Sequence, residues 1–129
     1  MEEVRISYKT AKLAHDKGFD YKDDSMILVK STKRGDVYHN LKQVNYTVED
    51  VKSVDRDSVI YYLAPTQSLL QKWLREEHKI HIQVNYLSLI KKYNTMILKT
   101  GIKGVHKKNF DTYEESLEEG LFKALDEIT

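Results

Sequence analysis

The final 19 residues of the chain, from Asp111 to Thr129, restrict its fold more than any other segment. Thr112 and Glu115 have the Thr-x-x-Glu spacing of a capping box, in which two side chains close the first turn of a helix. At the helical period the apolar side chains fall within about a third of the circumference. They are Tyr113, Leu117, Leu121, Ala124, Leu125 and Ile128. A helix with one apolar face has to be covered by a second layer of structure.

Gly120 lies at the edge of this apolar face, and a glycine inside a helix costs about 1 kcal/mol relative to alanine. Because glycine has no side chain, a neighbouring element can come close to the helix backbone at that point. We therefore expect the last helix to approach a sheet closely at Gly120.

Three segments before that helix predict the sheet. The clearest is Ile80–Tyr86, where apolar and polar side chains alternate with the period of a half-exposed strand. Tyr93–Lys99 can pair with it as a hairpin across the intervening segment Leu87–Lys92. Val59–Leu63 is β-branched and aromatic, which is typical of a buried strand.

Two further helices are predicted. One covers Ser7–Lys17, after which Gly18 suits the left-handed position just past a helix end and Phe19 can fold back on the helix. The other spans about 66–78, because Pro65 favours a helix start and an apolar stripe follows it. The stripe consists of Leu69, Leu70, Trp73 and Leu74.

Between these helices, Met26–Val29 and Val37-Tyr38 indicate two strands joined by a glycine-containing turn at Thr32–Asp36. Whether these strands near 26–38 join the main sheet is left open by the pattern. The segment Asn40–Asp57 is polar with scattered valines and predicts no element.

The order strand, helix, strand over Val59–Tyr86 predicts a right-handed parallel crossover, after which the hairpin extends the sheet antiparallel. The expected fold is therefore a two-layer α+β fold, in which helices pack on a mixed sheet. The single proline and five glycines provide no linker, so residues 1–129 are expected to form a single domain.

Composition limits the class of protein. The formal net charge of +1 gives no global attraction to acidic or basic partners, and the absence of cysteine excludes disulfides and thiolate metal sites. Met1-Glu2-Glu3 is acidic with no apolar run behind it, and no apolar stretch approaches the roughly 20 residues that cross a bilayer. We expect a soluble, cytoplasmic protein with no membrane partner and no cofactor.

Three blocks of the sequence form a recognisable pattern. They are Thr10–Ala14 with Lys17-Gly18-Phe19, then Ala64-Pro65-Thr66-Gln67 separated by four residues from Lys72-Trp73-Leu74-Arg75-Glu76, then Tyr113-Glu114-Glu115-x-Leu117-Glu118-x-Gly120-Leu121-x-x-Ala124-Leu125. In these blocks, about a third of its length, the chain resembles small proteins encoded in bacterial genomes, often in phages or prophages. The resemblance implies a shared fold and a mobile-element context. It implies no activity, cofactor or functional residue.

The strongest candidate binding segment is residues 80–110, which hold six lysines and no acidic residue. The lysines are Lys91, Lys92, Lys99, Lys103, Lys107 and Lys108. Lysines neutralise phosphates, and exposed aromatic rings such as Tyr86 and Tyr93 can stack on bases, so the segment predicts nucleic-acid contact. The alternative is an edge strand and loop that lysines protect against pairing with another sheet.

Gly101-Ile102-Lys103-Gly104 matches the GxxG loop that clamps a nucleic-acid backbone in KH domains. The context differs, because the KH loop joins two helices and this one follows a predicted strand. The match therefore adds little to the lysines around it.

Phe122 is the candidate residue for self-association, because it points away from the apolar face of the last helix. The lysine-rich segment and the acidic last helix are complementary in charge. They either join two copies of the chain in a homodimer or pair within one copy.

The sequence contains no legible catalytic or metal-binding constellation. His78 and His81 have a spacing that suits two ligands on one helix, but they straddle a predicted helix end and strand start. Glu114, Glu115, Glu118 and Glu119 follow the solvent side of the last helix. The sequence predicts a small non-enzymatic interaction or accessory protein, with a weak nucleic-acid binder and an unrecognised enzyme as alternatives.

Overall fold

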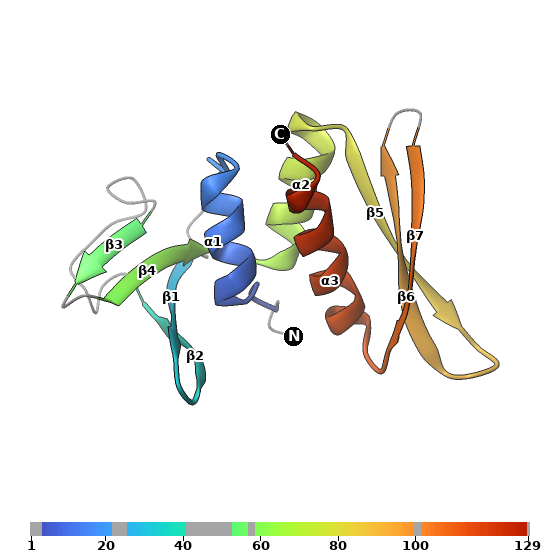
Figure 1. The fold of residues 1–129 in the computed structure, drawn as a ribbon, viewed down its shortest axis with the longest axis horizontal. Helices are drawn as coiled ribbons and strands as arrows, with labels where there is room; N and C mark the ends of the chain where they lie inside the picture. Colours follow the sequence, from blue (N-terminus) through green and yellow to red (C-terminus); the bar gives the residue numbers. More distant parts are fainter. Residues whose placement is uncertain (1–3, 22–25, 41–52, 57–58, 100–101, 129) are drawn as a thin grey trace. The chain divides into compact units, whose positions relative to one another are not determined.

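The computed structural model describes residues 4–21, 26–40, 53–56, 59–99 and 102–128. The chain divides into two compact units, residues 1–69 and 70–129, and each unit has its own antiparallel sheet (Figure 1). The boundary between the units falls inside helix α2 (Gln67–Glu77). The expectation of a single domain over residues 1–129 stays a prediction.

The first unit is a four-stranded sheet with one helix packed on it. Its strands are β1 (Ile27–Thr32), β2 (Gly35–His39), β3 (Ser53–Arg56) and β4 (Val59–Ala64), in the spatial order β2-β1-β4-β3. Helix α1 (Tyr8–Asp16) packs on β4 and β1. The buried core of this unit includes Ile6, Ala11, Ala14, Leu28, Val29 and Tyr62.

Helix α1 is capped at both ends, and its C-terminal end closes as the sequence predicts. The Ser7 hydroxyl accepts a hydrogen bond from the backbone N–H of Thr10 at 3.3 Å, so Ser7 caps the first turn. Gly18 has a φ of 89°, and the backbone N–H of Phe19 donates to the Ala14 carbonyl at 2.9 Å. This is the glycine-based closure expected at a helix end.

The β1–β2 hairpin is tied to the start of α1. Its turn contains Gly35, with a φ of 117°, as the sequence predicts. The Asp36 carboxylate accepts a hydrogen bond from the backbone N–H of Tyr8 at 2.8 Å, at a helix N-terminus where negative charge is favourable. The Tyr38 hydroxyl donates to the Ile6 carbonyl at 2.8 Å. These contacts fix the hairpin beside the N-terminal end of the helix.

The second unit is a three-stranded sheet covered on one face by a helix. Its strands are β5 (Ile80–Leu87), β6 (Lys92–Lys99) and β7 (Ile102–Phe110), in the order β5-β6-β7. Helix α3 (Tyr113–Asp126) packs on all three strands. The buried side chains of the sheet include Ile80, Ile82, Thr95 and Ile97, and α3 buries Leu117, Leu121, Ala124 and Leu125 against the sheet.

The last helix, its cap at Thr112 and its close approach to the sheet at Gly120 are confirmed, whereas Tyr113 of the predicted apolar face is 45% exposed. The Thr112 hydroxyl accepts a hydrogen bond from the Glu115 backbone N–H at 3.1 Å and donates to the Glu115 carboxylate at 2.9 Å. Gly120 is buried, and a Cβ built there would lie 3.0 Å from Cγ2 of Ile82 and closer still to Cγ2 of Thr95. The helix therefore approaches the sheet as closely as the glycine allows.

Helix α2 also follows the prediction to within one residue at each end. The Thr66 hydroxyl accepts a hydrogen bond from the Leu69 backbone N–H at 3.2 Å, so the cap is Thr66 and Pro65 precedes it. Leu70, Trp73 and Leu74 are buried, as their spacing indicates. In the second unit, the Gln71 side-chain amide donates to the Ile82 carbonyl at 3.0 Å, which satisfies a backbone group on the outer edge of β5.

The α+β class with helices packed on sheets is confirmed, but the parallel crossover is wrong. Strand β4 pairs antiparallel with β1 on one side and with β3 on the other, so neither of its edges is left for β5. β5 instead pairs antiparallel with β6, to which it is joined by four residues. The strands near 26–38 belong to the sheet of β4, and β3 lies in the segment for which no element was predicted.

Candidate functional site

Among the side chains of the second unit that the structure describes, the large exposed apolar ones gather around the turn between β5 and β6 and the start of α3. Leu89 is 99% exposed, Ile90 and Tyr86 are each 53% exposed, and Tyr113 at the start of α3 is 45% exposed. We call this surface the hairpin end and define it by Tyr86, Leu89, Ile90, Lys91, Tyr93, Tyr113 and Glu114. A single exposed apolar residue is ordinary on a soluble protein, whereas an adjoining group of them marks a contact surface.

The register of the hairpin places Leu89 and Ile90 at its apex. Leu87 pairs with Lys92, so the turn consists of residues 88–91, and the Ile90 backbone N–H donates to the Leu87 carbonyl at 3.2 Å. Lys91 has a φ of 54°, a left-handed conformation that glycine or asparagine adopts more easily. Turn chemistry alone favours Gly, Asn, Asp or Ser here, so it does not explain why two large aliphatic side chains occupy the apex.

Three tyrosines connect the turn to the start of α3. The ring centroids of Tyr86 and Tyr93 lie 5.0 Å apart, and those of Tyr93 and Tyr113 lie 6.3 Å apart in an edge-on arrangement. Aromatic pairs at these distances are attractive beyond the area that they bury. The three rings therefore form a continuous row from β5 across β6 to the start of α3.

Charged side chains flank this row of rings. Lys92 forms an ion pair with Asp111, just before α3. The Lys108 ammonium lies 5.2 Å from the ring centroid of Phe110, which pairs with Tyr93 across the β6–β7 ladder. Lys91 on the turn and Glu114 in the first turn of α3 are both exposed. Cations and carboxylates thus lie side by side at this end of the unit.

The structure divides the six lysines that the sequence grouped together. Lys91 belongs to the hairpin end, and Lys92 and Lys108 lie near it, at the end of the sheet that holds the β5–β6 turn. Lys99 ends β6 at the far end of the sheet, and Lys103 pairs with Leu98 near it. The side chains of Lys103 and Lys107 lie outside the described residues. Within the described residues, the lysines therefore form no continuous cationic strip.

The GxxG match is not a loop in the part that the structure describes. Ile102–Gly104 belongs to β7 and pairs with β6, while Gly101 lies outside the described residues. This backbone is extended, whereas the KH loop joins two helices.

Phe122, the candidate residue for self-association, is half-buried on α3 and interacts with other groups of the chain.

The histidines and carboxylates form no site in the described residues. The His78 ring lies 4.5 Å from the Trp73 ring, and His81 is exposed. Over the ranges that the structure describes, no three His, Asp or Glu side chains converge as a metal site would require. The His39 ring is half-buried and lies 5.5 Å from that of Tyr61.

A small pocket in the first unit admits about one water molecule, with a volume of about 10 Å³. It is lined by Ala11, His15, Phe19, Asp20, Tyr21, Met26 and Leu63. The His15 ring lies 5.2 Å from that of Tyr62, and burial raises the pKa of the Tyr62 phenol from its ordinary value of 10.0, with Tyr8 and Asp16 adding to the effect. The phenol therefore stays protonated at neutral pH.

The hairpin end is the surface that sequence reasoning missed. Leu87–Lys92 was treated as a connection between strands, although it contains the triplet Leu87-Ser88-Leu89 and then Ile90. The available signal was the absence of turn-forming residues other than Ser88 from a segment between two strands.

No family model, curated protein or solved structure matches this chain. Among the helices of the described residues, none has the length and apolar character needed to cross a membrane.

Proposed function

We propose that this chain is a small non-enzymatic interaction protein, an accessory factor of a phage or prophage that acts in the cytoplasm, and that the hairpin end is its contact surface. The observation that carries the proposal is the complete exposure of Leu89 at the apex of an ordered hairpin. Keeping a leucine and an isoleucine in water forgoes about 1.5–3 kcal/mol per side chain, which burial against a partner recovers.

The surroundings support the same function. Tyr86, Tyr93 and Tyr113 are the residue type enriched at protein contact surfaces, and Lys91 and Glu114 form a polar rim beside them. A few exposed anchors surrounded by such a rim account for most of the affinity in many interfaces. The mobile-element context rests on the resemblance of the three sequence blocks alone.

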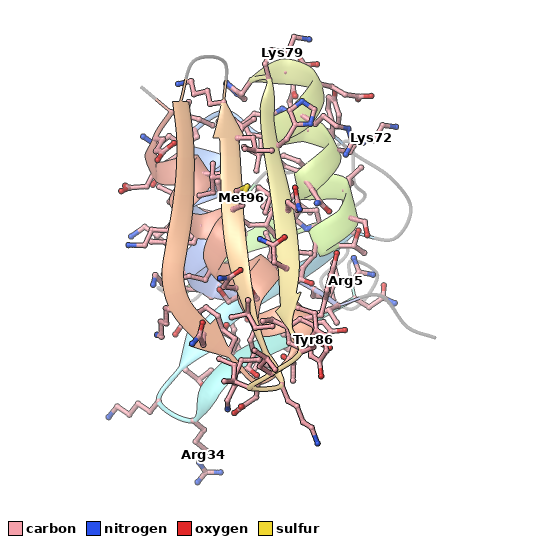
Figure 2. The ribbon with its side chains drawn as sticks, turned by 90° about the vertical axis from the view of Figure 1, so that its right-hand side faces the viewer. Arg5, Arg34, Lys72, Lys79, Tyr86 and Met96 are labelled. Carbon is pink, nitrogen blue, oxygen red and sulfur yellow. The ribbon has the colours of Figure 1, made fainter. Side chains whose placement is uncertain are left out.

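Site-specific photocrosslinking tests the proposal. A photoreactive residue replaces Ser88, which is exposed beside the apex, and a matched control replaces Lys72, which is exposed on α2 (Figure 2). In cells that carry the gene we expect discrete covalent adducts from position 88, none from position 72, and loss of the adducts when Leu89→Asp is added. Adducts that are equal at the two positions, or absent from position 88, contradict the proposal.

Nucleic-acid binding is the second candidate, favoured by Lys91, Lys92 and Lys108 beside the rings of Tyr86 and Tyr93. It is tested by titrating labelled single- and double-stranded oligonucleotides at two salt concentrations, since contacts to phosphates weaken steeply as salt rises. Binding that falls with salt and is lost in Lys91→Glu supports it. No binding at low salt removes it.

A further inference from the structure

We infer that the chain has a second contact surface, in its first unit, and that this surface binds duplex DNA. It is the distal part of the β1–β2 hairpin, residues 30–37, which we call the ribbon. The inference goes beyond the proposed function, which rests on the hairpin end of the second unit.

The ribbon is the part of the hairpin that extends past β4. Strand β1 pairs with β4 over Ile27–Val29, whereas it pairs with β2 as far as Thr32 and Gly35 (Figure 1). Among the described residues, β1 therefore pairs with β2 alone over the last three pairs of the hairpin. Every residue from 31 to 38 is exposed.

Hydrogen bonds hold the ribbon in place. The Thr32 hydroxyl donates to the Gly35 carbonyl at 2.7 Å and accepts from the backbone N–H of Arg34 at 3.2 Å, so it braces the turn. The bond from the Tyr8 backbone N–H to the Asp36 carboxylate ties the ribbon to the start of α1. A surface that is ordered before it binds loses less entropy on binding.

The charge of the ribbon is positive at its tip. Lys33 and Arg34 occupy the turn, and within the described residues neither forms an ion pair. The Arg34 side chain projects from the tip (Figure 2). The single acid of the ribbon, Asp36, faces a helix N-terminus, whose positive dipole offsets its charge. Two cations are therefore presented together, and phosphate oxygens are the acceptors that such side chains contact on DNA.

The shape and composition of the ribbon select the kind of partner. The tip is Thr32-Lys33-Arg34-Gly35, which contains neither an aromatic ring on which a single-stranded base could stack nor an apolar side chain for a protein or lipid surface. The major groove of B-form DNA is about 12 Å wide and admits a two-stranded ribbon. The major groove of duplex RNA is too deep and narrow for side chains to read.

The number of cations predicts weak binding that depends on salt. The Lys30 ammonium lies 5.5 Å from the ring centroid of Tyr61, so Lys33 and Arg34 are the groups available to phosphates. Each phosphate neutralised contributes about −0.9 to the slope of log K against log salt concentration, so we expect a slope of about −2. The dissociation constant is expected to be about 10⁻⁴ M, the weak end of non-specific binding.

The test is fluorescence anisotropy of a labelled DNA duplex of about 20 base pairs, titrated with the full chain at salt concentrations from about 25 to 200 mM. Lys33→Ala and Arg34→Ala are each expected to weaken binding by about tenfold at the lowest salt and to reduce the salt slope by about one. Arg75→Ala makes the same change at an exposed arginine of α2 and is expected to alter neither quantity. Circular dichroism of every variant checks that the fold is retained.

Two-dimensional NMR of the isotope-labelled chain locates the contact. The duplex is expected to shift the backbone amide signals of residues 32–35 and to leave those of residues 88–91, the turn of the hairpin end, unchanged. Single-stranded DNA and duplex RNA of the same length are expected to bind more weakly than the DNA duplex.

The inference is overturned if the folded wild type does not bind the duplex at the lowest salt, or if Lys33→Ala and Arg34→Ala both bind as the wild type does. Loss of binding in Lys91→Glu without loss in Arg34→Ala overturns it in favour of the hairpin end. A chain that binds phosphatidylserine vesicles but not the duplex overturns it in favour of a membrane. Crosslinking from position 88 does not involve the ribbon, so the proposed function and this inference fail separately.

Discussion

Thr95 on β6 and Gly120 on α3 lie in direct contact, and the Cγ2 methyl group of Thr95 occupies the space that a side chain at position 120 would need. Thr95 is fully buried, and its hydroxyl donates to the Ser116 carbonyl at 2.6 Å and lies 2.7 Å from the Ser116 hydroxyl. Both the methyl group and the hydroxyl of one side chain thus fix the distance between helix and sheet.

Gly120→Ala is expected to destabilise the chain by about 1–3 kcal/mol, because the added methyl group overpacks the contact with Thr95 and Ile82. The sign of this change in stability is informative, since alanine has a higher helix propensity than glycine and would stabilise an exposed helix by about 1 kcal/mol. The measurement is urea unfolding. The double variant of Gly120→Ala with Thr95→Ser, which removes Cγ2 of Thr95 and keeps its hydroxyl, is expected to recover part of the lost stability. A Gly120→Ala variant at least as stable as the wild type contradicts the close approach.

Thr95→Val is expected to destabilise the chain by about 1–2 kcal/mol, because it leaves the buried Ser116 hydroxyl without its partner while the side-chain volume hardly changes. Thr95→Ser, which keeps the hydroxyl, is the matched control for the hydrogen bonds. Urea unfolding of both variants separates the two contributions. Equal stability of Thr95→Val and the wild type would show that the hydrogen bonds to Ser116 add nothing.

Asp36→Ala is expected to loosen the N-terminal turn of α1 and to cost about 0.5–2 kcal/mol, because the backbone N–H of Tyr8 loses an acceptor with favourable charge. Asp36→Asn keeps an acceptor oxygen and is expected to cost less. Amide hydrogen exchange at Tyr8 measures the effect locally. Unchanged protection of that amide in Asp36→Ala contradicts the contact.

The Tyr62 phenol links stability to high pH. Its pKa is raised from 10.0 in the folded chain, chiefly by burial, so above about pH 10 the unfolded state releases a proton that the folded state still holds. Stability is therefore fully present below that pH and falls as the pH rises through the raised pKa. Unfolding free energies at about pH 9 and pH 11 measure the loss, and Tyr62→Phe is expected to reduce it. An equal loss of stability in the wild type and in Tyr62→Phe contradicts the assignment of this pH dependence to the Tyr62 phenol.

Much of the local structure could be predicted from the sequence because its signals are local. Gly18 has the positive φ that only glycine adopts easily, Thr112 and Glu115 form the capping interaction, and Ile80–Tyr86 shows the period of a strand. Each of these features depends on residues within one or two turns of chain.

The arrangement of the strands could not be predicted, because pairing is decided by competition between distant segments. The order strand, helix, strand suggested that β4 and β5 share a sheet, yet β1 and β3 occupy both edges of β4. β3 comes from a polar segment whose own pattern predicts no strand. A short hairpin partner costs less entropy to reach than a distant strand, which favours the pairing of β5 with β6.

The candidate site was hidden for a related reason. The six lysines are close in sequence, but β6 lies between Lys91 and Lys99, and its length of eight residues places these two lysines at opposite ends of the strand. Leu89 and Ile90 carry no chemical motif, and their importance follows only from their exposure at the apex of the turn. Exposure depends on what the rest of the chain leaves uncovered, which no local pattern contains.

The most direct test of the account uses the absence of cysteine from the chain, which allows a single cysteine to be placed at will. Ser88→Cys sets a thiol beside the apex without removing Leu89 or Ile90, and Lys72→Cys is the matched control on α2. Each thiol is labelled with a benzophenone maleimide and the folded proteins are irradiated in an extract of cells that carry the gene; we expect discrete covalent adducts from Ser88→Cys and hardly any from Lys72→Cys. Equal adduct formation by the two labelled variants would contradict a contact surface at the hairpin end.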